Sequence, residues 1–388
     1  LLTFLVWYAF GPDPSMSYAF VTSMTVLVIA CPCALGLATP ISVMVGVGRS
    51  AQMGVLIRNG DALQSAGKIS CLILDKTGTV TEGKPTVSNI EVLADFDKKS
   101  ILKFAASVES GSEHPLAAAI LQAAKDENIK SEKITDFEAI AGHGISAKIA
   151  QQTVLFGNEV LMDEKGVSYA SFKDKIEHLS AQGQTAMLLA VDNKIAGIIS
   201  VSDPIKPDSA KAVWQLERQG VRVIMVTGDN EITAKAIAKQ AGISEVRAQV
   251  LPEQKAAIAR ELQLAGQIVG MVGDGINDAP ALAQANVGFA IGTGTDVAIE
   301  SADIVILQGS LLKVSEAMAL SKATVTNIKQ NLLGAFFYNT IGIPVAAGVL
   351  YPLFGILLSP MIAGAAMAMS SLTVVTNANR LRWLSLND

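Results

Sequence analysis

The chain has 388 residues, of which 50% are hydrophobic and only 17% are charged, whereas soluble domains carry about 25% charged residues. The formal net charge of −5 argues against a nucleic-acid partner. Charged residues are absent from residues 14–48 and from residues 330–379, and about 20 apolar residues are enough to cross a bilayer. The composition therefore excludes a wholly soluble protein. It predicts membrane segments on either side of a globular part of ordinary charge, residues 49–329.

The first 48 residues are predicted to hold the end of one transmembrane helix and one complete span. The chain begins inside an apolar run, residues 1–10, that has no basic region and no small-residue cleavage site, so we expect no signal peptide. We expect instead that the start of this helix is missing and that the chain is the C-terminal part of a longer protein. Lys and Arg cluster where the apolar segments adjoin the globular part and at the C-terminus. By the positive-inside rule, these parts are cytoplasmic.

The complete span contains the triplet Cys31-Pro32-Cys33. Two residues two positions apart on a regular helix point about 200° away from each other, but a proline removes a backbone hydrogen bond and kinks or unwinds the helix. Broken helices in membranes commonly mark an ion or substrate site, and paired thiolates favour monovalent copper, zinc and their heavier relatives. The alternative is a pair of apolar cysteines that flank a kink. Three cysteines cannot form a disulfide framework, and we expect Cys71 to pack in a core.

The sequence DKTGT, residues 75–79, follows an apolar run at 69–74 that predicts a buried parallel strand. A carboxylate at the carboxyl end of such a strand lies where open α/β sheets place their chemistry. We predict that Asp75 attacks a phosphoryl group and carries it as an acyl phosphate. The alternative is an Asp that only caps a loop, and it would be preferred if no further motif agreed. The residues expected to bind the phosphate oxygens are Lys76, Thr77 and Thr79.

The rest of the globular part predicts two kinds of structure. Residues 86–199 predict a compact α+β insertion, with helical material at 101–124 and a hairpin at 191–195. Strands and helices then alternate, which predicts a doubly wound parallel sheet. The expected elements are a strand at 198–201, a helix at 208–219, a strand at 223–226, a helix at 232–241, a helix that begins near 252, and a strand at 268–272.

Polar sequences follow two further predicted strands where those strands end, at Thr227-Gly228-Asp229 and at GDGINDAP, residues 273–280. Because the carboxyl ends of parallel strands share one edge of a sheet, we expect both to converge with Asp75. Phosphoryl transfer requires an in-line nucleophile, a cation on the transferred group and Mg²⁺ on its oxygens.

Each polar residue that we expect at this edge of the sheet, including Lys255 from a neighbouring helix, has a predicted role. Thr227 and Lys255 are predicted to hold phosphate oxygens. Asp274 is predicted to bind Mg²⁺ with Asp75 and the Thr77 carbonyl. The remaining roles are Asp278 as a further Mg²⁺ ligand or its support, Asn277 as an orienting donor, and Gly228 and Asp229 as parts of the phosphate-binding turn.

The DKTGT and GDGINDAP sequences together resemble motifs of the haloacid-dehalogenase superfamily. As complete motifs they resemble those of its P-type ATPases. In the simple phosphatases of the superfamily, an acid stands two positions after the nucleophile. This chain has Thr77 there, so we expect the aspartyl phosphate to persist, as a pump requires. The resemblance is to the heavy-metal branch of the P-type ATPases, and it extends over nearly the whole chain.

Glu109 and the sequences SEHP and GHG resemble the nucleotide-binding domain of that branch. The resemblance implies that Glu109 and His114 contact the adenine. It also implies that Gly142 and Gly144 allow the backbone to approach the nucleotide. His143 and His178 lack such support, and we assign them to the surface or to packing. The residues expected to bind ATP are Glu109, His114, Gly142 and Gly144.

The last apolar stretch resembles the copper-exporting group of these pumps. The resemblance implies that Tyr338, Asn339, Met367 and Ser371 join Cys31 and Cys33 as ligands of transported monovalent copper. A zinc or cadmium pump would be expected to place a charged residue in this stretch, which has none. We expect Met369 to have only a packing role.

These inferences together predict the C-terminal part of an ATP-driven exporter of monovalent copper, with silver as a second candidate cargo. Its expected partners are membrane lipid, a cytosolic copper donor and a missing N-terminal part with the actuator domain. We expect a multi-pass protein of a prokaryotic plasma membrane with a cytoplasmic ATP site. The alternatives are a zinc, cadmium or lead exporter, a membrane-anchored phosphatase and a passive metal-binding protein. The expected boundaries are 1–48 for the first membrane part, 49–68 for a connector, 69–85 and 200–318 for a phosphorylation domain, 86–199 for a nucleotide-binding domain, 319–379 for a transmembrane hairpin and 380–388 for a tail.

Overall fold

A computed structural model describes residues 1–93, 96–112, 115–140, 142–292 and 295–385. The chain divides into two compact units, each described here by itself. The bounds of the first unit are Leu1–Ile69, Asp303–Val305 and Lys313–Asp388, and those of the second are Ser70–Ala302 and Ile306–Leu312.

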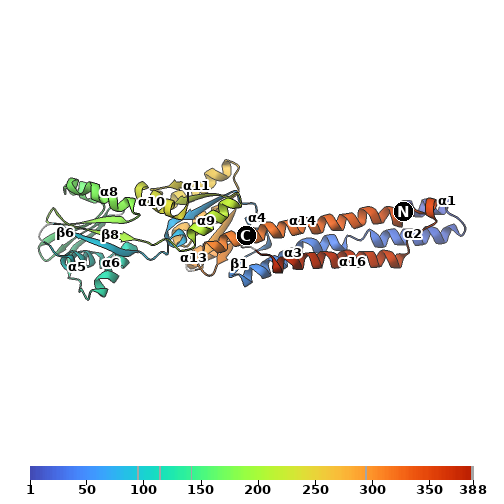
Figure 1. The fold of residues 1–388 in the computed structure, drawn as a ribbon, viewed down its shortest axis with the longest axis horizontal. Helices are drawn as coiled ribbons and strands as arrows, with labels where there is room; N and C mark the ends of the chain where they lie inside the picture. The colour runs from blue at the N-terminus through green and yellow to red at the C-terminus, as the bar shows by residue number, and fades with distance from the viewer. Residues whose placement is uncertain (94–95, 113–114, 141, 293–294, 386–388) are drawn as a thin grey trace. The chain divides into compact units, whose positions relative to one another are not determined.

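The first unit is built mainly from long helices that run alongside one another (Figure 1). Two stretches of the described residues are long and apolar enough to cross a membrane, Ser15–Gln52 and Pro360–Trp383. The long helices are α2 (Ser15–Ile29), α3 (Cys33–Gln52), α14 (Leu312–Ala346) and α16 (Pro360–Asn379). The shorter elements are α1 (Leu2–Phe10), α4 (Gly60–Ala66), α15 (Tyr351–Phe354), η4 (Arg380–Trp383), β1 (Val55–Ile57) and β13 (Ile304–Ile306).

The helix break predicted at the Cys-Pro-Cys triplet is confirmed. Helix α2 ends at Ile29 and α3 begins at Cys33, with Pro32 as its N-cap. Because proline has no N–H and clashes with the preceding turn, the hydrogen-bond ladder of α2 cannot continue into α3. The backbone of Cys31 instead turns back and donates to the Val28 carbonyl at 3.3 Å.

The second unit contains the predicted parallel sheet, in the strand order β12-β11-β2-β9-β10. The strands are β2 (Cys71–Asp75), β9 (Arg222–Val226), β10 (Glu245–Arg247), β11 (Val269–Gly273) and β12 (Val287–Ile291). The connecting elements are η1 (Lys76–Val80), α9 (Ser209–Arg218), α10 (Glu231–Ala241), α11 (Pro252–Leu264), η3 (Ile276–Asp278), α12 (Ala279–Gln284) and α13 (Asp296–Ser301). The sheet is buried on both faces, as its continuous apolar strands predict. Cys71 is fully buried in its core, as expected.

The same unit contains a six-stranded antiparallel sheet in the order β3-β8-β7-β6-β5-β4 (Figure 1). Its strands are β3 (Thr86–Val92), β4 (Ile134–Ile140), β5 (Gly144–Ile149), β6 (Gln152–Gly157), β7 (Thr185–Val191) and β8 (Lys194–Ser202). The strand expected at 198–201 in the parallel sheet belongs instead to β8, because it pairs antiparallel with β3 and β7. The helices with it are α5 (Lys98–Glu109), α6 (Pro115–Asp126), α7 (Glu159–Glu164), η2 (Ala170–Phe172) and α8 (Lys173–Ala181).

Successive residues of this sheet enter two different cores because strand side chains alternate between faces. Phe156 and Ile199 pack with α5 and α6, whereas Leu155 and Ile198 pack with α7 and α8. The helices therefore cover both faces of the sheet.

Two local predictions in this region are confirmed. The hairpin at 191–195 is confirmed, and Asp192 and Asn193 take φ values of 48° and 63°, as a tight two-residue turn requires. The helical material predicted at 101–124 is also confirmed. It is two helices, because α5 ends at Glu109 and Pro115, which fits only the first turn of a helix, begins α6.

Candidate functional site

Asp75 is the last residue of the central strand β2, and it is buried, with 7% of its surface exposed. It pairs in register with Val226, the last residue of β9, so Thr227 begins at the same edge of the sheet. Val272 at the end of β11 pairs with Leu74 in the same way, which brings Asp274 to that edge. The predicted convergence of the three polar sequences is confirmed by this register.

A lysine and three carboxylates meet at this edge. Lys255 Nζ donates to Asp75 Oδ1 at 2.6 Å and to Asp278 Oδ1 at 2.7 Å. One ligand atom from each of Asp75, Asp274 and Asp278 lies within 4.8 Å of the others. Asp278 also accepts from the backbone amides of Asp274 and Gly275, at 3.3 and 3.2 Å. We refer to Asp75, Lys255, Asp274 and Asp278 as the catalytic cluster.

The catalytic cluster shifts the protonation of its own members. Burial, and then the nearby Asp278 charge, raises the pKa of Asp75 to about 7 although Lys255 opposes the shift. Burial and Asp278 likewise raise the pKa of Asp274 to about 6. Burial alone would lower the pKa of Lys255, but Asp75 and Asp278 outweigh it and raise that pKa. The cluster is therefore short of positive charge.

The residues present fit a magnesium ion. Mg²⁺ prefers carboxylate, carbonyl and water oxygens in a compact arrangement, and this edge of the sheet offers the oxygens of Asp75, Asp274 and Asp278 within one ion's reach. A divalent cation there would also compensate the carboxylates that burial and mutual repulsion now disfavour in their charged form.

Two glycines make the close approach of these groups possible. Gly78 has φ +69°, and a Cβ on it would lie 1.6 Å from Asp274 Oδ2. A Cβ on Gly273 would lie 2.7 Å from the Asp278 carboxylate. The glycines of both sequences therefore leave room for the carboxylates of the catalytic cluster.

The remaining predicted catalytic residues surround the cluster. Lys76 Nζ forms an ion pair with Asp229 Oδ2 at 2.7 Å, and the buried Thr227 accepts from the Asp229 amide at 3.2 Å. The Thr77 side chain is exposed. Thr79 Oγ1 is buried without a hydrogen-bond partner among the described residues. Gly228 lies in the Thr227-Asp229 turn and Asn277 is exposed in η3.

The predicted nucleotide-binding residues lie with the antiparallel sheet. Glu109 is 2% exposed at the end of α5, and burial raises its pKa despite a hydrogen bond with Ser112. Its Oε2 atom has no hydrogen-bond partner within the described part of the chain. Gly142 and Gly144 have φ values of +77° and +145°. His114 lies outside the described residues.

The two histidines left without a role lie on the surface as expected. His143 Nδ1 is 3.2 Å from Glu164 Oε2, and His178 Nε2 is 3.0 Å from Gln182 Nε2.

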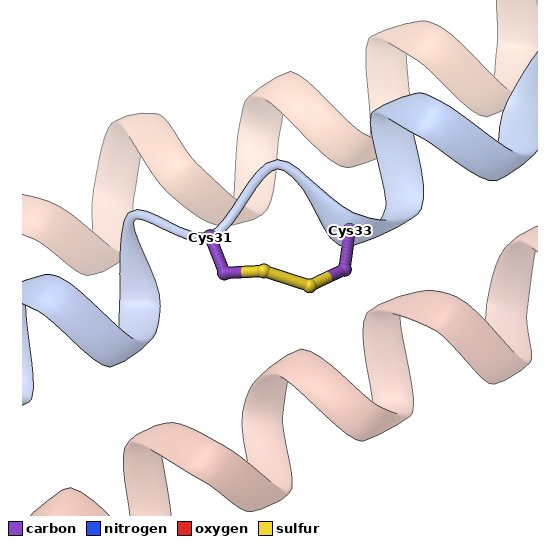
Figure 2. The surroundings of a disulfide bond; sticks show 2 residues. All are labelled: Cys31 and Cys33. Carbon is purple, nitrogen blue, oxygen red and sulfur yellow. A yellow bond between two sulfur atoms is a disulfide. The ribbon is translucent and has the colours of Figure 1, made fainter.

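In the helical unit, the break between α2 and α3 brings Cys31 and Cys33 to the same side of the chain (Figure 2). Their Cα atoms are 5.4 Å apart and their sulfurs are joined as a disulfide. This differs from the two free thiols that the sequence suggested, since a disulfide sulfur is not a thiolate ligand. The reduced pair would present both sulfurs to one ion, which a continuous helix would prevent.

The other predicted copper ligands come from α14 and α16. Met367 is 7% exposed and packs in one cluster with Cys31 and Ile29. Asn339 Oδ1 is buried, and no hydrogen-bond partner for it occurs among the described residues. Tyr338 is 38% exposed and Ser371 is half-buried. The packing role expected for Met369 is wrong within this chain, because its side chain is 54% exposed.

The sequence matches the haloacid dehalogenase-like hydrolase family over residues 69–286, more than half of the chain. The chain belongs to this family. The match includes the catalytic cluster, and it also includes the antiparallel sheet that interrupts the parallel one. The parallel sheet with its carboxylate cluster is thus the family's hydrolase domain.

Relatives with similarity beyond this domain are heavy-metal pumps. The chain is 51% identical to a copper-exporting P-type ATPase of Vibrio cholerae, over the whole chain and 42% of that protein. It is 48% identical to a silver-exporting P-type ATPase of Salmonella typhimurium, over the whole chain and 47% of that protein. The chain therefore spans about half the length of the curated relatives it matches.

Solved structures give the same result for the fold. A crystal structure of a zinc-transporting P-type ATPase matches with a TM-score of 0.78 and 34% identity, over 98% of this chain and 61% of that one. The catalytic domain of a CPx-ATPase matches with a TM-score of 0.55 and 28% identity, over 71% of this chain and 98% of that one.

Two residues that were not predicted from the sequence, Lys206 and Asp203, hold the DKTGT loop of this hydrolase domain and the residues after it. Lys206 Nζ donates to the Gly78 carbonyl and, at 2.8 Å, to the Gly309 carbonyl. Asp203 accepts from the Thr81 hydroxyl and from the amides of Gly83 and Lys84. The available signal was the sequence DPIK, residues 203–206, because it places charged residues directly after strand β8.

Proposed function

We propose that this chain is part of an ATP-driven exporter of monovalent copper, with silver as a second candidate cargo, that works through an aspartyl phosphate on Asp75. The observation that carries the proposal is the buried Asp75 carboxylate at a strand end, bonded to Lys255 and within 4.8 Å of two further carboxylates. The copper- and silver-exporting relatives, at 51% and 48% identity over the whole chain, support the choice of cargo.

The proposed chemistry begins when an Asp75 oxygen attacks the γ-phosphorus of ATP. The bond from that phosphorus to the bridging oxygen of ADP breaks, and the phosphoryl group becomes an acyl phosphate on Asp75. Lys255, together with the Thr227 hydroxyl, stabilises the transferred oxygens. Bound Mg²⁺, held by Asp75, Asp274, Asp278 and the Thr77 carbonyl, would supply further positive charge.

Thr77 supports a long-lived acyl phosphate rather than rapid hydrolysis. A threonine at this position carries no carboxyl group that could activate a water molecule against the phosphorus. The phosphoenzyme then persists until another part of the protein promotes hydrolysis, and in pumps of this kind that part is the actuator domain.

The proposed copper site uses the reduced pair Cys31 and Cys33 with the thioether of Met367. Thiolates and thioethers are soft ligands that suit monovalent copper or silver. The packing of Cys31 with Met367 and the unpartnered buried oxygen of Asn339 support this assignment, because buried polar atoms normally have a partner. Tyr338 and Ser371 complete the proposed set.

We also propose the domain assignment given by the sequence. Residues 69–85 and 200–318 form the phosphorylation domain and 86–199 the nucleotide-binding domain, where Glu109, His114, Gly142 and Gly144 bind ATP. Residues 1–48 and 319–379 cross a prokaryotic plasma membrane, and the ATP site is cytoplasmic. Lipid, a cytosolic copper donor and an N-terminal part with the actuator domain complete the working pump.

The second candidate function is export of zinc, cadmium or lead. The zinc-transporting structure that matches at 34% identity favours it. Against it stand the higher identity to copper and silver exporters and the uncharged stretch at 330–379. A membrane-anchored phosphatase is the remoter alternative.

The test is the metal dependence of ATP hydrolysis by the full-length protein. Hydrolysis should rise with monovalent copper under reducing conditions and should not rise with zinc. Stimulation by zinc alone would overturn the choice of copper. Rapid turnover of a simple phosphoester without any metal-stimulated ATP hydrolysis would favour the phosphatase.

A further inference from the structure

A buried group of amide and hydroxyl side chains joins α3, α14 and α16. Ser42 Oγ shares its one proton between the Ala38 carbonyl of its own helix, at 2.7 Å, and Asn327 Oδ1, at 2.9 Å. Asn331 Nδ2 donates to Ser42 Oγ and to Asn327 Oδ1, both at 3.1 Å. Asn377 Nδ2 donates to Asn331 Oδ1 at 2.9 Å, while Asn327 Nδ2 donates to the Asn377 carbonyl at 2.9 Å. We refer to Ser42, Asn327, Asn331 and Asn377 as the amide network.

The chemistry of the amide network is that of a connector between helices. Its atoms are neutral oxygen and nitrogen donors, which a soft monovalent metal does not prefer. Ser42, Asn327 and Asn331 are at most 5% exposed. Because buried polar groups are costly when unpaired, a shift of any one helix along its axis would leave several of these groups without partners. The network therefore favours one axial register of the three helices.

The amide network lies at a similar distance from the proposed copper ligands on every helix. Ser42 follows Cys33 by nine residues on α3, Asn331 precedes Asn339 by eight on α14, and Asn377 follows Met367 by ten on α16. At 1.5 Å per residue, these separations are each about 12–15 Å.

Small side chains lie between the amide network and the proposed copper ligands. Ala34 and Ala38 of α3 pack with Ala335 of α14 and Val374 of α16. Because alanine side chains are short and have no rotamers to adjust, α3 and α16 approach closely, and Ala335 of α14 packs against them. A change of register at the amide network would therefore be passed on to the ligand layer.

We propose that the amide network sets the axial register of α3, α14 and α16 and so fixes the distances among the copper-ligating side chains. Asn331 is its central positioning residue, since it joins Ser42 on α3, Asn327 on α14 and Asn377 on α16. This proposal rests on the proposed function for the identity of the ligands, whereas the register itself does not depend on copper.

The first test measures copper binding by the full-length protein. Asn331→Leu removes the centre of the network while keeping the number and branching of the side-chain heavy atoms, and Ser42→Ala removes one hydroxyl. Residues that couple distant parts of a protein through a packed network typically change the coupled affinity roughly 2–30-fold, so Asn331→Leu should weaken monovalent copper binding within that range and Ser42→Ala by less. X-ray absorption should show altered copper–sulfur distances in Asn331→Leu.

The matched control is Thr324→Val. Thr324 is also buried on α14, but its hydroxyl donates to Leu320 within the same helix, at 2.8 Å. Copper affinity and the absorption spectrum should therefore stay unchanged. A folded Asn331→Leu variant that matches this control in both would overturn the proposal and leave the proposed function intact.

A second test is independent of copper. In a protein with Cys31→Ser and Cys33→Ser, the pair Ala38→Cys and Ala335→Cys should form a cross-link, because both alanines lie in one packed cluster. Adding Ser42→Ala or Asn331→Leu should lower the cross-linking yield at least about twofold, and adding Thr324→Val should not. An unchanged yield in both network variants would overturn the register claim, whatever the protein transports.

Discussion

The catalytic cluster and the cysteine pair both depend on an interruption of regular structure, but they differ in chemistry. Strand β2 ends at Asp75 before a loop that Gly78 allows to turn, and helix α2 stops before Cys31 because Pro32 follows. The cluster then gathers charged oxygen and nitrogen groups, whereas the cysteine pair lies in a stretch that contains no charge. Hard ligands suit Mg²⁺ and soft ligands suit monovalent copper. The proposed function therefore assigns a different cation to each site on the basis of ligand type.

The largest effect is expected from Asp75→Asn, which tests whether the cluster is the site of covalent chemistry. The amide cannot attack phosphorus, so acid-stable label from γ-labelled ATP should fall by on the order of 10⁴-fold or more. Asp136→Asn, at an exposed ion pair on β4, should label like the unmodified protein. Hydroxylamine-sensitive label that persists in Asp75→Asn would show that another residue is the nucleophile.

Lys255→Met is expected to have the next largest effect. It removes the cation that touches both Asp75 and Asp278, and it also removes the partner that holds down the Asp75 pKa. Phosphorylation should fall roughly 10²–10³-fold, and its pH profile should move to higher pH because the carboxylate forms later. A lower rate with an unmoved profile would show that Lys255 binds the nucleotide without controlling Asp75.

Gly78→Ala tests whether the loop after β2 requires a residue without a Cβ atom at this position. The added Cβ would fall 1.6 Å from Asp274 Oδ2, so the carboxylate must move. A displacement of about 1 Å at such a site can cost on the order of 10²-fold in rate. The control is Gly220→Ala, which also has a positive φ but has nothing within 4 Å of the added atom. Equal losses in both variants would attribute the effect to backbone strain.

A smaller effect concerns magnesium and pH. In the folded, metal-free unit the pKa of Asp75 is about 7 and that of Asp274 is about 6. At a pH between the ordinary carboxyl pKa and these raised values, both groups are therefore protonated in the folded unit and ionised in the unfolded chain. Their contribution to stability is therefore present at low pH and is lost as pH rises through 7. Mg²⁺ competes with these protons, so its affinity should rise about tenfold or more from pH 5.5 to 8.

Thermal unfolding with and without Mg²⁺ measures this competition. The stabilisation by Mg²⁺ should be larger at pH 8 than at pH 5.5, and Asp274→Asn should reduce it at pH 8. A stabilisation that does not change with pH would place Mg²⁺ away from the catalytic cluster.

The sequence predicted the cluster better than it predicted the loops around it. An apolar run that ends in a polar residue is a local sequence pattern. Because the strands are parallel, the polar residues that follow such runs lie at one edge of the sheet. Asp75, Thr227 and Asp274 could therefore be predicted to lie close together. Lys206 could not, because its contacts with Gly78 and Gly309 depend on how separate loops fold over one another. The sequence predicted helical material at 101–124 but did not divide it into α5 and α6.

The helical unit shows the same limit. Pro32 predicted the break between α2 and α3, but periodicity alone did not identify Met369 as exposed, since an apolar helix in a membrane has no polar face to mark its outside. The amide network was not predicted either. Four polar residues spread over three helices give no local signal, and only the packed helices bring them into contact.

The most direct test of the account is whether copper at the cysteine pair controls phosphorylation of Asp75. In the full-length protein under reducing conditions, label from γ-labelled ATP should rise with monovalent copper, and this rise should vanish in Cys31→Ser and in Cys33→Ser while ATP binding is retained. An equal copper-dependent rise in both variants would contradict the account.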